Sequence, residues 1–272
     1  MTLTNMEGKN AVITGGASGI GLGLARAIVA AGGRVLLADI EGAKAASAAK
    51  ELGNQSLSHA VDVMDDASIN TLADFAFAEM GEVHLLANNA GVGLMRPLTK
   101  SRMDDYEWIF GVNMRAIVSG VRHFAPRMME QEGPAHVLNT GSEHSLGLPF
   151  PGMGLYTASK HAVLGYSDVL RAELAEHDIG VSVLCPAVVN TEVWNATRNR
   201  PDDLGGARQA PEAAAEFMRK GMSADEVGKI ALEGVLRNEF IITTHPQVRD
   251  LADARARAVT QAFDILDQSQ TP

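Results

Sequence analysis

The sequence predicts an α/β fold: a single domain over 1–272, built on a doubly wound parallel sheet of about seven strands with helices on both faces. Two observations lead to this prediction. Short β-type runs alternate with segments of helical periodicity over roughly the first 190 residues. A glycine-rich turn, Thr14–Gly21, follows the first run, and sheets of this kind bind ligands beyond the carboxyl ends of their strands.

The predicted strands are short and mostly apolar, as expected of a parallel sheet that is buried on both faces. In chain order they are 11–14, 35–38, 56–61, 83–87, 136–139, 181–185 and 240–243. Helices are predicted where apolar residues return at intervals of three and four. In chain order they are 22–31, 41–52, 66–80, 102–112, 113–131, 157–177, 212–220, one that begins after Ser223, and 247–268.

Residues 192–222 interrupt this alternation with polar, glycine- and proline-rich sequence. We expect them to form a lid over a substrate site, and a disordered surface insertion is the alternative. Ser223 can cap the helix that follows. Two acidic residues in the first turn of that helix also favour a helix start here. The tail, 246–272, is predicted to be helical.

Composition excludes several classes of function. The 272 residues carry a net charge of −10, which would repel a nucleic-acid backbone. No signal peptide or membrane span is evident, and the single cysteine, Cys185, suits a reducing compartment, so we expect a cytoplasmic protein. The eight histidines show no ligand spacing, so no metal site is predicted.

Tyr156 and Lys160 stand four residues apart near the start of a predicted helix, so their side chains share one face. An ammonium at roughly 4 Å favours a phenolate by about 4 kcal/mol at an effective dielectric of about 20. The pair could therefore supply a general base near neutral pH. The alternative is two surface side chains that share this spacing by chance.

The glycine-rich turn can receive a pyrophosphate. Gly15, Gly19 and Gly21 permit a tight turn and a close approach to the helix N-terminus, and no Gly-Lys-Ser/Thr follows as in a P-loop. Asp39 ends the second strand, where a carboxylate accepts ribose hydroxyls and repels a 2′-phosphate. Because Ile40 is not basic, the sequence favours NAD over NADP. Asp39 could otherwise cap the helix from Glu41.

These motifs occur in the order and spacing of the short-chain dehydrogenase/reductase family, which the chain resembles over roughly 5–245. They are Thr14–Gly21, Asp39, Asp62-Val63, Asn88–Gly91, Asn113, Ser142 and Tyr156-x-x-x-Lys160. The resemblance implies a Rossmann fold and an NAD(P)-dependent alcohol/carbonyl oxidoreductase, with Asn113, Ser142, Tyr156 and Lys160 as the catalytic set. Cofactor contacts are expected from Tyr156, Lys160, Gly15, Ser18, Gly19, Ile20, Gly21, Asp39, Asp62, Val63, Asn89, Ala90, Gly91, Pro186, Val189 and Thr191.

Two positions need comment. Asp62 could accept a bond from the adenine amino group or cap the turn at Asp65. The family commonly has Pro-Gly after the sixth strand, whereas this chain has Pro186-Ala187, which affects the local geometry of that loop.

The resemblance also implies a mechanism. Tyr156, as phenolate, takes the proton of the substrate hydroxyl while hydride passes to the nicotinamide. Lys160 should lower the pKa of Tyr156 and hold the nicotinamide ribose, and Ser142 should orient the substrate oxygen. Asn113 is expected to hold a helix distortion and a proton-relaying water.

The expected substrate wall is mostly apolar and suggests a hydrophobic or aryl secondary alcohol or ketone. Its candidate residues are His144, Phe150, Met153 and Trp194, and His144 could instead be a solvated loop residue. The segment Phe240–Arg249 resembles the tail of bacterial members that oxidise aryl alcohols at a benzylic carbon, such as lignin Cα-dehydrogenases. A hydrolase is disfavoured because Gly141–Ser145 is not a Gly-x-Ser-x-Gly elbow.

Two further expectations follow. A catalytically silent nucleotide-binding or scaffold protein is the alternative function, although neither the Tyr/Lys pair nor the glycine turn is broken. The resemblance implies a homo-oligomer, tetramer or dimer, with helices 113–131 and 157–177 at an interface. An apolar stripe of Val118, Val121, Phe124 and Met128 could serve that interface or the chain's own core.

Overall fold

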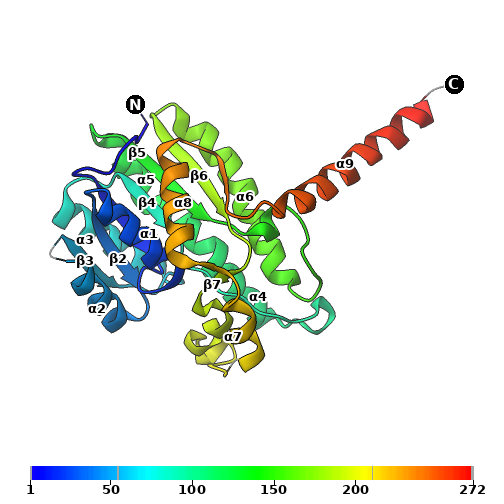
Figure 1. Cartoon of the computed structure of the whole chain (residues 1–272), viewed down its shortest axis with the longest axis horizontal. Coiled ribbons are helices and arrows are strands. Elements are labelled where there is room, and N and C mark those ends of the chain that lie inside the picture. The colour runs from blue at the N-terminus through cyan, green and yellow to red at the C-terminus, as the bar shows by residue number, and fades with distance from the viewer. Residues whose placement is uncertain (1, 54, 210, 271–272) are drawn as a thin grey trace.

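The computed structural model describes residues 2–53, 55–209 and 211–270. Within them one parallel sheet has seven strands in the order β3-β2-β1-β4-β5-β6-β9 (Figure 1). The strands are β1 (Asn10–Thr14), β2 (Arg34–Asp39), β3 (Ser56–Ala60), β4 (Leu85–Asn88), β5 (Ala135–Thr140), β6 (Ile179–Cys185) and β9 (Ile241–Thr243). Strand order reverses between β1 and β4, which makes their carboxyl ends the topological switch point. The predicted fold class is confirmed.

Helices cover both faces of this sheet. Helices α1 (Gly19–Ala30), α2 (Gly42–Leu52) and α8 (Ala224–Leu236) pack on one face. Helices α3 (Asp66–Met80), α5 (Ala116–Glu130) and α6 (Gly154–Ala175) pack on the other. A hydrophobic core lies on each face of the sheet. Successive residues of a strand point alternately into the two cores, because side chains alternate across a strand. In β1, Ile13 belongs to the first core and Val12 to the second.

The two helices predicted over 102–112 and 113–131 form one continuous helical run. Helix α4 (Met103–Phe110) passes through a π-helical turn, η2 (Gly111–Arg115), directly into α5. The residues at both junctions keep right-handed helical dihedrals, so the helix is wider for one turn and remains continuous. The helix distortion expected at the junction of the two predicted stretches is therefore present as a π-helical turn.

The predicted lid, 192–222, carries short helices, and position 210 within it lies outside the described residues. They are η4 (Glu192–Asn199), η5 (Asp202–Leu204) and α7 (Glu212–Met218), flanked by the paired strands β7 (Val189–Asn190) and β8 (Met222–Ser223). Arg200 anchors the lid: its Nη1 lies 2.8 Å from Oδ1 of buried Asp105, and its guanidinium lies 5.0 Å from the Trp108 ring centre. We keep the name lid for 192–222.

The tail helix α9 (Val248–Gln270) leaves the body of the molecule and points away from it (Figure 1). Residues 271–272 of the predicted tail lie outside the described part of the chain. Two single-turn helices, η1 (Leu98–Lys100) and η3 (Glu143–Ser145), complete the assignment. In the described residues, no helix combines the length and apolar character that a membrane span requires.

Candidate active site

The turn between β1 and α1 is shaped by its glycines. Gly15 and Gly19 adopt positive φ angles of +64° and +53°, which other residues rarely tolerate. A Cβ at Gly21 would lie 2.3 Å from the Gly15 carbonyl oxygen, so a larger residue would displace the turn. Ser18 stands at the N-cap of α1 without a capping side-chain hydrogen bond. The turn therefore presents a helix N-terminus, whose dipole favours an anion.

Asn89 braces this turn against the end of β4. Its side-chain amide donates to the carbonyl oxygens of Thr14 (3.0 Å) and Gly15 (3.3 Å). In return, Oγ1 of Thr14 accepts hydrogen bonds from the backbone N–H groups of Asn89 and Ala90, at 3.0 and 3.1 Å. Asn89 and Ala90 are thus held directly against the glycine turn, and their cofactor contacts stay a prediction.

Asp39 lies at the carboxyl end of β2 and is buried. Its Oδ2 accepts the Ala17 N–H and its Oδ1 the Glu41 N–H, both at 3.0 Å. Each carboxylate oxygen can accept more than one hydrogen bond, so ribose hydroxyls can still donate to it. The N-cap of α2 is Glu41, so the interpretation of Asp39 as that cap is wrong, and the ribose contact stays a prediction.

Asp62 caps the turn that follows β3. Its Oδ1 accepts the Met64 N–H at 2.9 Å, whereas the Asp65 N–H bonds to the backbone carbonyl of Asp62. The capping interpretation is thus confirmed, with Met64 rather than Asp65 as its side-chain partner. Asp62 also lines the central cavity, which leaves an adenine contact open.

Tyr156 and Lys160 occupy the first two turns of α6, and the interpretation of a surface pair is wrong. Lys160 is 3% exposed, and its Nζ donates to the Thr140 carbonyl at 2.7 Å. Nζ lies 5.8 Å from the centre of the Tyr156 ring. The end of β5 therefore holds the ammonium beside the phenol.

Burial dominates the pKa values of this pair. It raises the pKa of Tyr156 above its ordinary value, against the hydrogen bond with Ser142, which lowers it. Burial also lowers the pKa of Lys160 to about 8. Glu143 and Cys185 raise the pKa of Tyr156 further, so the expected lowering by Lys160 stays a prediction for the chain with its cofactor bound.

Asn113 lies in the π-helical turn and is fully buried. Its Oδ1 accepts the Val92 N–H at 2.8 Å, and its Nδ2 donates to the Val92 carbonyl at 3.0 Å and to Ser159 Oγ at 3.1 Å. The wide turn thus places the amide between the loop after β4 and the start of α6. Asn113 therefore holds these two segments together through its hydrogen bonds to Val92 and Ser159.

The loop after β5 holds Ser142 against α6. Its hydroxyl accepts the His144 N–H at 3.2 Å, and its own N–H donates to Ser145 Oγ at 3.2 Å. Ser145 in turn donates to the Lys160 carbonyl at 2.7 Å. Ser142 therefore has a fixed position beside the phenol of Tyr156.

His144 is buried, so its interpretation as a solvated loop residue is wrong. Its Nδ1 lies 2.7 Å from Thr157 Oγ1, and its ring packs edge-on against Tyr156 and Phe150, with centres 5.1 and 5.3 Å apart. Burial lowers the pKa of His144 to about 4, which keeps the imidazole neutral near pH 7. His144 thus packs directly on the phenol ring.

A cavity of about 240 Å³ is lined both by the glycine turn and Asp39 and by Ser142, Tyr156 and Lys160. All the predicted cofactor residues line it except Gly21, which packs inside the glycine turn. Ser142 also lines the cavity, while Asn113 does not. The four substrate candidates His144, Phe150, Met153 and Trp194 are all described, and none is part of the cavity wall.

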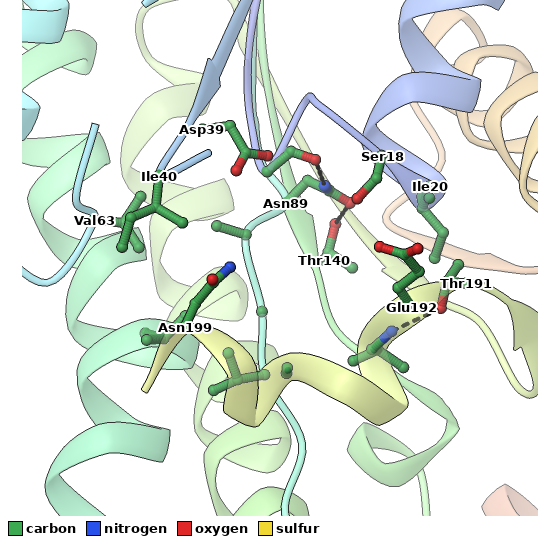
Figure 2. Close-up of a pocket in the computed structure, with 18 of the residues that line it drawn as sticks. Ser18, Ile20, Asp39, Ile40, Val63, Asn89, Thr140, Thr191, Glu192 and Asn199 are labelled. Carbon is green, nitrogen blue, oxygen red and sulfur yellow. Dashed lines mark hydrogen bonds between the residues drawn. The ribbon is translucent and has the colours of Figure 1, made fainter. Parts of the chain in front are cut away.

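Sequence reasoning missed one wall of this cavity. Figure 2 shows η4, with Glu192 and Asn199, on the side that faces Asp39 and Ser18. Glu41 and Arg198 also line it. No local motif marks these residues, because the lid reaches the end of β2 only through the tertiary fold.

Comparison with known proteins agrees with this geometry. The short chain dehydrogenase family profile matches residues 9–202. The chain is 31% identical over 269 residues to the C alpha-dehydrogenase of Sphingobium sp. strain SYK-6, covering 94% of this chain and 87% of that protein. It is 34% identical over 226 residues to the 1-deoxy-11-beta-hydroxypentalenate dehydrogenase of Streptomyces avermitilis, covering 81% and 83%.

A solved structure is similar over nearly the whole chain. It is a short chain dehydrogenase/reductase from Burkholderia phymatum in complex with NAD, with a TM-score of 0.88, 35% identity, and coverage of 95% of this chain and 96% of that one. The predicted resemblance, including that to C alpha-dehydrogenase, is confirmed. The chain belongs to the short-chain dehydrogenase/reductase family of oxidoreductases.

Proposed function

We propose that this chain is an NAD-dependent oxidoreductase that interconverts a hydrophobic or aryl secondary alcohol and its ketone, with Tyr156 as general acid/base. One observation carries the proposal. Tyr156, Lys160 and Ser142 line the same cavity as the glycine turn and Asp39. A hydride carrier and a proton-transfer group would therefore meet in one cavity.

The residues present fit a nicotinamide dinucleotide. The turn is kept tight because a Cβ at Gly21 would meet the Gly15 carbonyl oxygen, and Ser18, Gly19 and Ile20 at the N-terminus of α1 line the cavity. Asp39 supplies carboxylate acceptors, and Thr191 and Lys160 line the same cavity. Asp39 supports NAD, because its charge opposes a 2′-phosphate.

When bound, the cofactor accepts or donates the hydride. In oxidation, Tyr156 takes the proton from the substrate hydroxyl while Ser142 donates a hydrogen bond to the substrate oxygen. Since burial raises the pKa of Tyr156, nearby positive charge is needed to favour the phenolate, and the buried Lys160 ammonium supplies part of it. In reduction, Tyr156 returns the proton.

The relatives support the substrate class. One is named a C alpha-dehydrogenase and another a 1-deoxy-11-beta-hydroxypentalenate dehydrogenase, so both names describe dehydrogenases and the second includes a hydroxyl group. The ring of His144 packs against Tyr156 and that of Phe150 against His144, so aromatic side chains surround the phenol although neither lines the cavity. Benzylic secondary alcohols are therefore the first substrates to try.

The test is a spectrophotometric screen that follows the reduced cofactor, with NAD or NADP and a panel of aliphatic, alicyclic, steroid and benzylic secondary alcohols. We expect turnover with NAD on a benzylic or other hydrophobic alcohol. Tyr156→Phe should lower kcat at least 10²-fold while NAD still binds. Unchanged turnover in this variant would reject Tyr156 as the acid/base. NAD binding without turnover on any alcohol would favour the alternative of a silent nucleotide-binding protein.

We also propose a homo-oligomer, a tetramer or dimer. The predicted stripe on α5 gives it little support, because Val121, Phe124 and Met128 are buried in the chain's own core and only Val118 is exposed. The support comes instead from α9, whose Phe263 and Ile265 are 61% and 67% exposed. Apolar side chains gathered on a projecting helix commonly mark a protein interface.

A further inference from the structure

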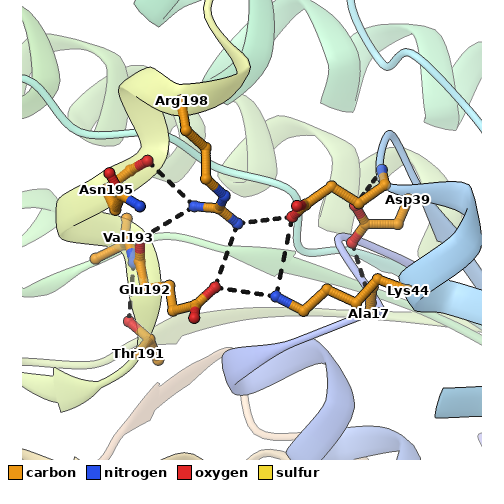
Figure 3. A network of polar contacts seen from close by, with 9 residues as sticks. Ala17, Asp39, Lys44, Thr191, Glu192, Val193, Asn195 and Arg198 are labelled. Carbon is orange, nitrogen blue, oxygen red and sulfur yellow. Dashed lines mark hydrogen bonds and ion pairs between the residues drawn. The ribbon is translucent and has the colours of Figure 1, made fainter. Parts of the chain in front are cut away.

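Four charged side chains join the lid to α2 beside Asp39, and we call Glu41, Lys44, Glu192 and Arg198 the ribose-side ion cluster (Figure 3). Arg198 Nη2 lies 2.7 Å from Glu41 Oε2 and 3.4 Å from Glu192 Oε2. Lys44 Nζ lies 2.9 Å from Glu192 Oε2 and 4.0 Å from Glu41 Oε2. Each cation therefore has both carboxylates as neighbours.

This cluster borders the cavity at the end of β2. Glu41, Glu192 and Arg198 line the cavity together with Asp39. The Arg198 side chain is 27% exposed, and its Nη1 donates to the Asn195 carbonyl at 3.1 Å, which fixes the guanidinium. The hydrogen bond from Arg198 is the main cause that lowers the pKa of Glu41. The pair is thus ionised and held in place near neutral pH.

We propose that Glu41 and Glu192 determine cofactor specificity by occupying the two cations, Arg198 and Lys44, that a 2′-phosphate would need. The proposal rests on the function proposed above, in which the cavity takes a nicotinamide dinucleotide with its adenosine ribose at Asp39. It adds a second element of selection to Asp39 itself, supplied by the lid and α2 together.

The charge at this end of the cavity gives the physical reason. Asp39, Glu41 and Glu192 contribute −3 and Lys44 and Arg198 contribute +2, a sum of −1. A phosphate brings close to two further negative charges and must displace a carboxylate before it reaches a cation. Glutamine at both glutamate positions changes the sum from −1 to +1. An arginine and a lysine without acidic partners would then suit a phosphate.

The experiment compares dissociation constants for NAD and NADP by calorimetry on the whole chain. In the Glu41→Gln/Glu192→Gln variant we expect the ratio Kd(NADP)/Kd(NAD) to fall at least tenfold, with the Kd for NAD changed less than threefold. Glutamine keeps the size of each side chain and an amide oxygen that can still accept a hydrogen bond from Arg198 or Lys44. Adding Arg198→Ala to this variant should abolish most of the gain, because the phosphate then loses its guanidinium.

A matched control is Asp225→Asn. Asp225 pairs with Arg26 at 2.7 Å in an exposed ion pair, so this change alters the net charge away from the cavity and should leave the ratio unchanged. An unchanged ratio in the double glutamine variant would overturn the proposal, as would equal weakening of both cofactors, which would show that the cluster only fastens the lid.

Binding of NAD and NADP to the wild-type protein distinguishes a failure of this proposal from a failure of the proposed function. Tighter binding of NADP than of NAD by the wild type would reject the proposed NAD preference, and the ratio in the double variant would still report on the two glutamates. Binding of neither dinucleotide would overturn both proposals. Turnover with each cofactor provides a second readout, in which kcat/KM should follow the same ratio.

Discussion

At the scale of single residues, buried histidines make the stability of this protein depend on pH. His136 is fully buried, with Nε2 2.8 Å from Ser182 Oγ, and burial, reinforced by Arg171, lowers its pKa to about 3. Burial lowers the pKa of His144 to about 4, and His161 makes a smaller contribution in the same direction. An unfolded histidine titrates near ~6.5. Below that pH the unfolded chain takes up protons that the folded chain refuses.

The sign follows from these depressed values: both histidines contribute stability above about pH 6.5 and lose it as the pH falls toward their folded pKa values. Between pH 6.5 and 5.0 we expect each to cost about 1.6 kcal/mol of unfolding free energy, and the two about 3 kcal/mol. Urea unfolding at the two pH values measures this loss. His144→Phe should make it smaller by about 1.6 kcal/mol.

The exposed His177 provides the control, since His177→Asn should leave the loss between the two pH values unchanged. Comparing each variant with itself at the two pH values removes any general destabilisation caused by the substitution. A loss in His144→Phe equal to that of the wild type would show that the imidazole is not held neutral in the folded protein.

The positions of the candidate site residues were predictable because their signal is local. Tyr156 and Lys160 share a helix face through their spacing alone, and the glycine turn carries its conformational demand in its composition. The burial of His144 was not predictable, because it depends on Thr157 and Phe150 closing over the ring. The raised pKa of Tyr156 was not predictable for the same reason: charge spacing is visible in a sequence, whereas burial of the phenol is not.

At the scale of elements, glycines set the contact between α1 and α8. A Cβ at Gly23 would lie 2.2 Å from the Ala224 carbonyl oxygen, and one at Gly228 would lie 2.2 Å from the Gly23 carbonyl carbon. Gly23→Ala and Gly228→Ala should each lower the free energy of unfolding by about 1–3 kcal/mol, because the two backbones must separate. Because α1 also begins at the glycine turn, we expect weaker NAD binding as well.

Gly165→Ala is the matched control. Gly165 lies within α6, is exposed, and a Cβ there would meet nothing within 4 Å. Alanine is the better helix former, so this variant should be as stable as the wild type or more stable by up to about 1 kcal/mol. Denaturant midpoints measure all three variants. Equal stability of Gly228→Ala and Gly165→Ala would contradict the close α1–α8 contact.

The order of strands and helices followed from periodicity, and most predicted elements are present within a few residues of their expected ends. The continuity of α4, η2 and α5 did not follow from periodicity. The π-helical turn depends on the hydrogen bonds that Asn113 makes and not on a helix-breaking residue. In the lid, α7 was predicted as 212–220, whereas η4 and η5 were not. Their position depends on the buried pair of Arg200 and Asp105, which the sequence separates widely.

At the scale of the whole molecule, α9 is the element that the fold of one chain does not explain. Its 23 residues extend for about 34 Å, and nearly all of them after Ala252 are exposed. Isolated helices in water are marginal, so its stability calls for a partner surface. Val259, Phe263 and Leu266 follow one another at intervals of four and three, which places them on a single stripe suited to helix pairing.

The charges of α9 favour a second copy of the same helix as that partner. Its first half carries Arg249, Arg255 and Arg257 with Asp250 and Asp253, a net charge of +1, and its second half carries Asp264 and Asp267, a net charge of −2. Two copies packed antiparallel would bring these opposite charges side by side while burying both stripes. We therefore expect a chain that ends at Gln247 to sediment as a smaller species than the full chain at micromolar concentration.

The point variant Phe263→Glu/Leu266→Glu tests the stripe without removing the helix. It should reproduce the smaller species, because two carboxylates cannot be buried in an apolar seam without a large cost in free energy. Val118→Glu on α5, exposed but outside α9, is the comparison that should keep the mass of the full chain. If Val118→Glu dissociates the assembly and the α9 variants do not, the interface lies on the body of the molecule, as the family resemblance first implied.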